Sequence, residues 1–351
     1  MSLLGQGAYG QVIKKKDCAT KKFNKLPHII QEFCALQYLK NTNHVVHAKR
    51  VNVEKKELDM DLYEYSMRKW MNDDDCCHCQ DCLNILFRDI LIGLVELQDR
   101  NLAHGDIKPG NILVQCDPTL KAVLGDCGFV SVAGYAKQQR TAQSYRDIKV
   151  ANDIKHDMFS FGIMMLELFY HVKPVMHDHY KDYQRLIRKK VTDAAHAKLL
   201  TLLLHENREL RPDARTTLKM LYQHDVPVYL LPKQIDYNNL IKKACKRYDE
   251  EEIKKWELTL KHNYKQLDIK RSRTGFKAFL MFITQHQVDK TMLNFYLAAT
   301  CIIVASVFGN QTPIISNILM VCELPDHNKQ QLLKIIDVMM HDDLFLTVLY
   351  N

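Results

Sequence analysis

Apolar residues in the N-terminal part of the chain form short runs and one longer helical repeat. Residues 12–23 are rich in Lys, with a tight turn expected near Lys16, which predicts a pair of strands. Residues 27–39 carry apolar side chains three or four positions apart, which predicts a helix with Pro27 in its first turn: Ile29, Phe33, Leu36 and Leu39. Residues 51–53 and 58–62 predict two further strands. A sheet with one helix is therefore expected.

Longer apolar helices are predicted in the middle of the chain. Residues 83–97 place apolar side chains at helical steps: Leu86, Ile90, Leu94 and Leu97. Residues 159–170 and 196–204 are largely apolar, as helices of a core would be. Short apolar runs at 112–114 and 121–124 flank a turn at Asp117-Pro118 and predict a second strand pair.

Pro227 and Pro232 mark a natural boundary, and the pattern beyond them is helical throughout. The predicted helices are 239–267, 274–285, 290–308, 312–322 and 328–340. A helical bundle of about 100 residues is the plain structural interpretation.

Composition places few limits on this picture. The chain has 351 residues, enough for two hydrophobic cores, and 47% hydrophobic with 26% charged residues is usual for a soluble protein. The net charge of +8 suits anionic nucleotides or acidic partners. Because the sequence has no long Lys/Arg run, direct nucleic-acid binding is not predicted.

No signal peptide is predicted at the N-terminus. The longest apolar stretch, 295–308, contains Thr300 and Ser306 and is short for a membrane span, so a buried helix and no membrane partner are expected. Eleven Cys without a secretory signal predict reduced thiols in the cytoplasm or nucleus.

Candidate chemistry is concentrated in residues 104–111, His-Gly-Asp-Ile-Lys-Pro-Gly-Asn. A carboxylate at Asp106 can orient a hydroxyl, the ammonium of Lys108 can neutralise a moving phosphoryl group, and the amide oxygen of Asn111 can hold magnesium. The alternative is a polar loop between a helix and a strand, so partners elsewhere in the chain must decide.

A possible phosphate-binding loop lies near the N-terminus. Gly5, Gly7, Gly10 and Val12 match G-x-G-x-x-G-x-V, in which glycines let a backbone lie close over phosphates. A glycine-rich turn between strands is the commoner explanation of such a pattern. Lys21 follows in an A-x-K pattern, although several other Lys residues are nearby.

Together these residues resemble eukaryotic-type protein kinases over about residues 1–224. The ordered elements are Gly5 to Gly10, Lys21, Glu32, residues 104–111, Asp126, and Asp157 with Arg211. Residues 26–32 resemble the PSTAIRE-type helix of cyclin-dependent kinases. The resemblance implies an α+β bilobal fold, with an N-lobe at 1–65, a C-lobe at 66–224, a linker at 225–238 and a helical domain at 239–351.

The resemblance also implies roles, ATP and Mg²⁺ as cofactors, and a protein substrate. Asp106 and Lys108 would be catalytic, and Asn111 and Asp126 would hold Mg²⁺. Lys21, set by Glu32, would position ATP. The adenine would be covered by Val12, with Met60 as gatekeeper and the backbone from Asp61 to Tyr63 as hinge.

Three departures from the kinase pattern concern control. Gly105 replaces the Arg of H-R-D, so phosphate-dependent ordering is not expected. Cys127 replaces the Phe of D-F-G. Lys149 stands where A-P-E has its Glu, and a Lys could not form the usual ion pair with Arg211. Thr141 and Ser144 are possible phosphosites. A scaffold built on a degenerate kinase lobe is the alternative function.

Residues 297–308 and 312–316 resemble a cyclin box, and 328–340 would be its last helix. Val307 and Asp337 stand where that family has the Lys–Glu pair that grips the kinase. An ordinary bundle is the alternative. The resemblance implies an intramolecular cyclin-like partner, although docking between two chains stays open, as does the oligomeric state. Such a compact fusion is typical of a large DNA virus.

Five metal-ligating side chains crowd into residues 76–82: Cys76, Cys77, His78, Cys79 and Cys82. The C-x-x-C spacing is zinc-like. Structural zinc usually joins two separated ligand pairs, and no second pair is evident, so the pattern favours a Cys-rich loop entering a helix over a metal site.

Overall fold

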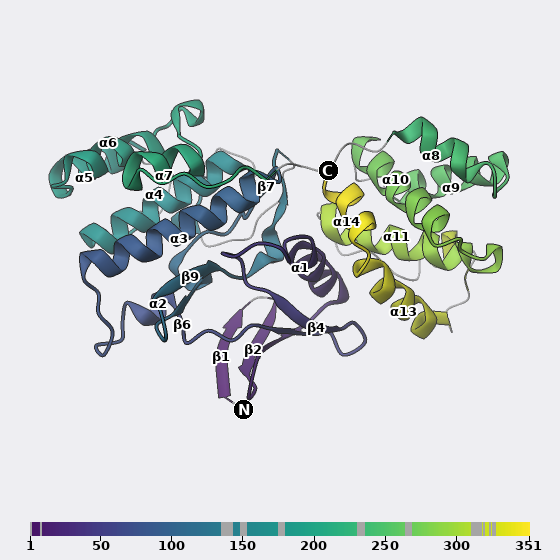
Figure 1. Ribbon diagram of the computed structural model, residues 1–351, viewed down its shortest axis with the longest axis horizontal. Coiled ribbons are helices and arrows are strands. Elements are labelled where there is room, and N and C mark those ends of the chain that lie inside the picture. The colour runs from purple at the N-terminus through teal and green to yellow at the C-terminus, as the bar shows by residue number, and fades with distance from the viewer. Residues whose placement is uncertain are drawn as a thin grey trace. The chain divides into compact units, whose positions relative to one another are not determined.

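The computed structural model describes residues 2–7, 9–134, 143–147, 153–174, 180–229, 236–263, 269–309, 318, 320–322, 324 and 328–351. The chain divides into two compact units (Figure 1). The first contains Met1–Lys40, His47–Asp61 and Pro232–Asn351, and the second contains Asn41–Val46 and Leu62–Leu231. Residues 1–40 and 47–61 of the predicted N-lobe therefore belong to the same unit as the C-terminal helices.

The first unit begins with an antiparallel sheet in the order β1-β2-β3-β5-β4. Its strands are β1 (Ser2–Gly7), β2 (Gly10–Lys14), β3 (Ala19–Phe23), β4 (Ala48–Asn52) and β5 (Glu57–Met60). The strand pair predicted within residues 12–23 is confirmed. The strand expected at 51–53 begins earlier, at Ala48, and the one expected at 58–62 ends at Met60, because the chain leaves the sheet there.

Helix α1 (Leu26–Tyr38) carries Pro27 in its first turn, as predicted. Apolar side chains are buried around much of its circumference, including Ile29, Ile30 and Phe33. A helix that is apolar on several faces has to be covered on several faces. Here β3, β4 and β5 contact α1, and so do three helices from the C-terminal end of the chain, α11, α13 and α14.

The helices of this unit's C-terminal part are α8 (Tyr237–Ala244), α9 (Glu250–Asn263), α10 (Ile269–Gln285), α11 (Leu293–Phe308), α13 (Lys329–Met340) and α14 (Asp343–Tyr350). The single helix predicted at 239–267 is wrong, because α8 ends at Ala244 and α9 starts at Glu250. Between them Tyr248 turns inward, and its hydroxyl lies 3.1 Å from the Ile283 carbonyl and 3.0 Å from that of Val288.

The apolar pattern ends the bundle at residue 340, but the structure adds α14 after it. Asp342 begins this helix, because its Oδ1 accepts a hydrogen bond from Phe345 N at 2.6 Å. With eight residues, α14 is too short for a clear helical repeat. Most of the helix predicted at 312–322 lies outside the described residues.

Helix α11 is the central helix of this bundle, and most of its residues are buried. By length and composition alone, Lys290–Phe308 could also cross a membrane, but 72% of its most apolar window is buried inside the protein. Burial of this kind is what a core helix shows, as the sequence predicts for residues 290–308.

The second unit contains helices α2 (Met67–Trp70), α3 (Gln80–Gln98), α4 (Ile154–Tyr170), α5 (Tyr180–Lys190), α6 (Ala194–Leu203) and α7 (Ala214–Tyr222). Strands β6 (Tyr65–Ser66), β8 (Ile112–Gln115) and β9 (Lys121–Leu124) form one small sheet, and β7 (Leu102–Ala103) pairs with β10 (Ser131–Val132). The predicted strand pair around Asp117-Pro118 is β8–β9. Helices α2, α5 and α7 were not predicted, because they are short or carry many charges.

The first part of the predicted linker packs on the second unit. Tyr229 N donates to Asp99 Oδ2 at 2.9 Å, and the Arg100 guanidinium lies 3.6 Å from the centre of the Tyr229 ring. Arg215 Nη1 donates to the Val226 carbonyl. The chain thus stays attached to this unit as far as residue 229, and α8 begins at Tyr237.

Candidate active site

The segment that the sequence marks for phosphoryl transfer forms a compact polar cluster in the second unit. Asp106 Oδ2 accepts hydrogen bonds from Lys108 Nζ at 2.6 Å and from Asn111 Nδ2 at 2.7 Å. Asn111 Nδ2 also donates to the Asp106 carbonyl at 2.9 Å. The short helical turn Pro109–Asn111 brings Asn111 back toward Asp106. All three predicted residues therefore meet at one carboxylate.

Asp157, in the first turn of α4, holds the backbone just before this cluster. Its Oδ2 accepts from His104 N at 2.6 Å, and its Oδ1 accepts from Gly105 N at 2.8 Å. Burial raises the pKa of the Asp157 carboxyl to about 7, while the amide groups of Gly105 and His104 oppose that rise. Through these two bonds, α4 braces the backbone of the loop.

The imidazole of His104 links the loop to the turn that carries Asp126. His104 Nε2 lies 3.0 Å from the Gly125 carbonyl, which can only accept, so the proton is assigned to Nε2. Nδ1 then accepts from Asp106 N at 3.3 Å. Burial lowers the pKa of His104, which favours this neutral form. The ring therefore acts as a fixed spacer between the two segments.

Gly105 has a structural reason to be glycine. Its φ is +81°, in the left-handed region where a Cβ clashes with the backbone. Its N–H donates to Asp157, so the conformation is held in place. An arginine at this position would carry a strain of ~1–2 kcal/mol.

The chemistry of the donor atoms near Asp126 fits a magnesium ion. Asp126 follows β9 and adopts a left-handed conformation, with φ +54°. Gly125 N donates to the Asn111 carbonyl at 2.8 Å, which ties the two candidate ligands together through the backbone. The amide nitrogen of Asn111 donates to Asp106, so the amide oxygen of Asn111 is the atom of this side chain that could ligate a cation. A carboxylate and an amide oxygen are ligands that Mg²⁺ accepts.

Lys21 and Glu32 lie together in the first unit. Lys21 is in the middle of β3, opposite Val12 on β2 and Leu58 on β5, and Glu32 lies on α1. Lys21 Nζ is 2.6 Å from Glu32 Oε2, and the two side chains are 9% and 2% exposed. The predicted pairing of these residues is confirmed, whereas their action on ATP stays a prediction.

The glycines of the N-terminal strands differ in what surrounds them. A Cβ on Gly10 would lie 1.9 Å from the Lys22 carbonyl oxygen, so the β2–β3 pairing itself requires glycine there. A Cβ on Gly5 or Gly7 would meet nothing within 4 Å. Packing among the residues that the structure describes therefore does not explain these two glycines, which suits a backbone that must leave room for phosphates.

The predicted hinge begins where β5 ends. Met60 is buried, and Asp61 N donates to the His47 carbonyl at 3.1 Å. Tyr63 falls in the second unit, so the predicted hinge residues come from both units.

Arg211 has an ion-pair partner that the sequence prediction missed. Arg211 Nη1 lies 2.6 Å from Asp147 Oδ2, and both side chains are 0% exposed. The Tyr180 hydroxyl donates to the other oxygen of Asp147. The expectation that this arginine lacks its acidic partner is therefore wrong: Asp147 fills the role, two positions before Lys149. Lys149 and Thr141 lie outside the described residues.

Residues 1–228 match the protein kinase domain family. The chain belongs to the protein kinase family. The N-terminal sheet with α1 and the helical second unit are the two lobes of this kinase domain.

Three relatives place the kinase domain near serine/threonine kinases. It is 25% identical over 187 residues to a probable cyclin-dependent serine/threonine-protein kinase of Dictyostelium discoideum, which covers 48% of this chain. It is 24% identical over 264 residues to serine/threonine-protein kinase STK11 of Rattus norvegicus, which covers 63% of this chain. It is also 24% identical over 240 residues to mitogen-activated protein kinase mpk-1 of Caenorhabditis elegans, which covers 58% of this chain. The chain spans 13%, 58% and 52% of these relatives' own lengths.

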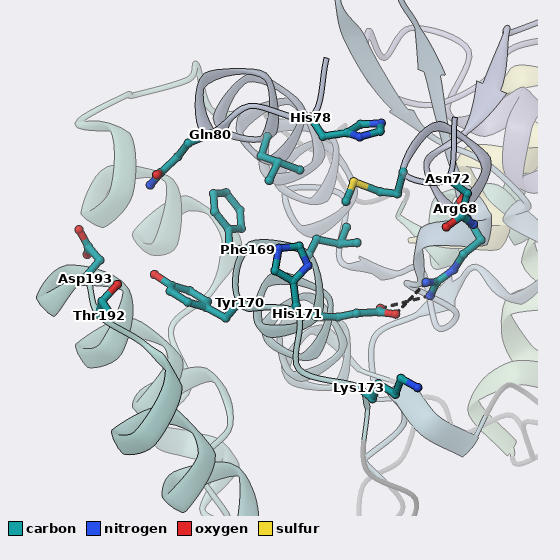
Figure 2. A pocket seen from close by; sticks show the side chains of 14 residues that line it. Arg68, Asn72, His78, Gln80, Phe169, Tyr170, His171, Lys173, Thr192 and Asp193 are labelled. Atoms are coloured by element: carbon teal, nitrogen blue, oxygen red, sulfur yellow. Dashed lines mark hydrogen bonds and ion pairs between the residues drawn. The ribbon is translucent and has the colours of Figure 1, made fainter. Parts of the chain in front are cut away.

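The kinase C-lobe also contains a cavity of ≈ 590 Å³, which lies apart from the cluster around Asp106 in its lining residues (Figure 2). Arg68 and Glu167 form an ion pair of 2.7 Å on its wall, and the Tyr145 hydroxyl bonds to both. His171 and Asp193 lie on other parts of the wall. None of the predicted catalytic residues lines this cavity.

Proposed function

We propose that this chain is an ATP-dependent serine/threonine protein kinase, similar to cyclin-dependent kinases, whose own C-terminal helices act as a cyclin-like activating domain. The observation that carries the catalytic part is the meeting of Lys108 and Asn111 at the Asp106 carboxylate, on a backbone braced by Asp157. The serine/threonine kinases among its relatives support the substrate class.

Asp106 would orient the acceptor hydroxyl of the protein substrate. Lys108 and Asn111 both bind Oδ2, so Oδ1 is the oxygen that we assign to the substrate hydroxyl. A hydroxyl bound there would point its oxygen at the group to be transferred. Lys108 Nζ lies beside the same carboxylate and would offset the charge of that group as it moves.

Mg-ATP would supply the phosphoryl group and the cation that offsets its negative charge. Lys21, oriented by Glu32, would hold the α- and β-phosphates under the backbone of Gly5 and Gly7. Asn111 and Asp126 would ligate the cation. Adenine would be bound by the side chains of Val12 and Met60 and by the backbone from Asp61 to Tyr63.

Activation in cis is supported by what covers α1. Glu32 is on this helix, and α11, α13 and α14 pack against it within the same unit. The ring centroids of Phe33 and His341 are 4.9 Å apart, and Lys40 Nζ lies 2.6 Å from Asp343 Oδ2. The C-terminal helices would thus keep Glu32 in reach of Lys21. Because they share the chain with α1, they do so at a high effective concentration.

Replacing the Asp106 carboxylate tests the catalytic assignment. Asp106→Asn keeps the size of the side chain and removes its negative charge, so phosphotransfer should fall by ~10²–10⁴-fold with the fold intact. Asp225→Asn is a matched control, because Asp225 is 71% exposed in a surface ion pair. Equal activity of Asp106→Asn and wild-type protein would contradict the assignment.

A non-enzymatic scaffold is the second candidate, favoured by Gly105 and Cys127, which replace two residues of the kinase pattern. In that case the degenerate kinase lobes would present the helical domain to regulatory proteins. A thermal-shift assay with Mg-ATP, paired with radiolabelled phosphotransfer, separates the two functions. Binding without transfer to any protein substrate would favour the scaffold.

A further inference from the structure

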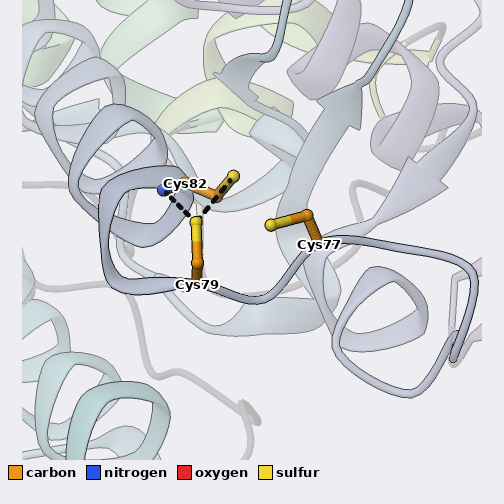
Figure 3. A group of neighbouring side chains, drawn as sticks. All are labelled: Cys77, Cys79 and Cys82. Atoms are coloured by element: carbon orange, nitrogen blue, oxygen red, sulfur yellow. Dashed lines mark hydrogen bonds between the residues drawn. The ribbon is translucent and has the colours of Figure 1, made fainter.

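Three thiols outside the active site converge on one point. The Sγ atoms of Cys77, Cys79 and Cys82 all lie within 4.8 Å of one another (Figure 3). Cys79 Sγ and Cys82 Sγ are 3.4 Å apart. Cys77 and Cys79 are exposed and Cys82 is half-buried, so an ion from solution can reach the group. None of the three belongs to the proposed catalytic residues.

The distances suit a tetrahedral metal. At a Zn–S bond of ~2.3 Å, two thiolates of a tetrahedral site lie ~3.8 Å apart. The closest pair here is slightly nearer than this, and the whole set needs only small side-chain shifts to reach it. Zn²⁺ is the borderline-soft ion that thiolates select, whereas Mg²⁺ and Ca²⁺ prefer oxygen ligands.

The backbone around the thiols is already held in place. Cys79 is the N-cap of α3, and its sulfur accepts a hydrogen bond from Cys82 N at 3.5 Å. His78, between two of the cysteines, donates from Nε2 to the Trp70 carbonyl at 2.6 Å. Its ring also packs edge-on against the Trp70 ring, with centroids 4.8 Å apart. An ion would therefore bind without having to order this loop first.

The charges beside the loop also favour a cation. Asp73, Asp74 and Asp75 directly precede the cysteines in the sequence. Asp75 N donates to Asp73 Oδ1 at 3.1 Å, and Cys76 N donates to the Asp73 carbonyl at 3.1 Å, so the acidic turn is folded next to the loop. Its negative potential raises the local concentration of divalent cations.

We propose that Cys77, Cys79 and Cys82 form a zinc site with three thiolate ligands. Because Cys77 and Cys79 are exposed, water would take the fourth position. Three thiols lose their protons to the buffer as three Zn–S bonds form, so binding one Zn²⁺ releases three protons at a pH where the thiols are protonated. The bound ion ties the segment before α3 to the first turn of that helix. This site is independent of the proposed kinase activity.

Cobalt is the probe for the full-length, reduced chain, because thiolate-to-cobalt charge transfer gives a strong absorption band. Titration should saturate at one Co²⁺ per chain with a tetrahedral spectrum, and one equivalent of Zn²⁺ should bleach it. The band intensity reports the number of thiolates, so this measurement on unmodified protein tests the ligand set directly. A chain without a thiolate band would overturn the proposal.

Serine variants test the individual ligands. Loss of supporting groups around a metal already weakens binding ~10–100-fold, so Cys77→Ser, Cys79→Ser and Cys82→Ser should each weaken Zn²⁺ binding at least ~10-fold. Cys245→Ser is the matched control, because Cys245 is an exposed free cysteine in the other unit. Equal affinity of the ligand variants and this control would contradict the site. So would a Cys79–Cys82 disulfide, two hydrogens lighter, in protein kept in reductant.

Discussion

The ring of Tyr38, near the end of α1, stacks on the ring of Tyr350 in the last helix, with centroids 4.9 Å apart and planes at 20°. Tyr38 also donates from its hydroxyl to Asn351 Oδ1 at 3.2 Å. These contacts join the helix that carries Glu32 to the last residues of the chain. The helix that carries a predicted ATP-site residue thus contacts a segment more than three hundred residues away in the sequence.

The Lys21–Glu32 pair should be sensitive to loss of either charge. Glu32→Gln removes the negative charge that pairs with the buried Lys21 ammonium, and breaking such a pair costs ~3–5 kcal/mol. We expect a lower Tm and phosphotransfer reduced by at least ~10-fold, with a raised KM for ATP. Glu54→Gln, at an exposed position of the same unit, is the control. Wild-type Tm and KM in Glu32→Gln would show that the pair has no such role.

The buried Arg211–Asp147 pair predicts a second stability effect. Asp147→Asn should lower the stability of the second unit by ~3–5 kcal/mol, because Arg211 is fully buried. By contrast, Arg208→Ala removes a pair that is 46% exposed on the arginine side, and surface pairs contribute only ~0–1 kcal/mol. Urea unfolding of the two variants measures the difference. Similar losses in both would argue against the importance of the Asp147 pairing.

Gly105 and Gly110 form a matched pair in the catalytic loop. Gly105→Ala should destabilise the protein by ~1–2 kcal/mol, because φ is +81° there. Gly110→Ala should be nearly neutral, because the nearest atom to its Cβ would be Lys108 Cε at 4.0 Å. Thermal melts of the two variants test this. If Gly110→Ala lost as much stability as Gly105→Ala, the left-handed backbone would not explain why position 105 has glycine in place of the arginine of the kinase pattern.

Stability should fall in mild acid because of His156. Burial lowers the pKa of His156 from 6.5 to about 4, so the unfolded chain takes up this proton at a higher pH than the folded one. The contribution of His156 is present in full above pH 6.5 and is lost between pH 6.5 and about 4, by up to ~1.4 kcal/mol per pH unit.

His156→Gln isolates this effect. Asp157, whose pKa is raised, changes stability in the opposite direction over the same range, but it is present in both proteins. The fall in Tm between pH 7 and pH 5 should therefore be smaller in His156→Gln than in wild-type protein. An identical fall would rule out His156 as a source of acid sensitivity.

The local chemistry could be predicted from the sequence because its parts are close together. One short loop contains Asp106, Lys108 and Asn111. Glu32 lies in the helix that directly follows the strand of Lys21. The helix α1 was predicted nearly to its ends, because its apolar repeat and Pro27 are strong local signals.

Pairings across the fold could not be predicted in this way. The pairing of Asp147 could not be predicted, because its partner, Arg211, is distant in sequence. The kinase pattern has its acidic residue two positions later, where this chain has Lys149. Tyr248, which separates α8 from α9, looks like one more residue of a long amphipathic pattern until its hydroxyl is seen to bond to the Ile283 carbonyl. The joining of the C-terminal helices to α1 in one unit is likewise a tertiary fact.

The most direct test of activation in cis is the phosphotransfer rate of residues 1–235, alone and with residues 236–351 added as a separate polypeptide. We predict that the shortened chain transfers phosphate at least ~10-fold more slowly than the full chain. Adding the C-terminal helices should restore the rate with a saturable concentration dependence, because they again cover α1 and hold Glu32 near Lys21. Full activity of residues 1–235 alone would contradict activation by the C-terminal helices.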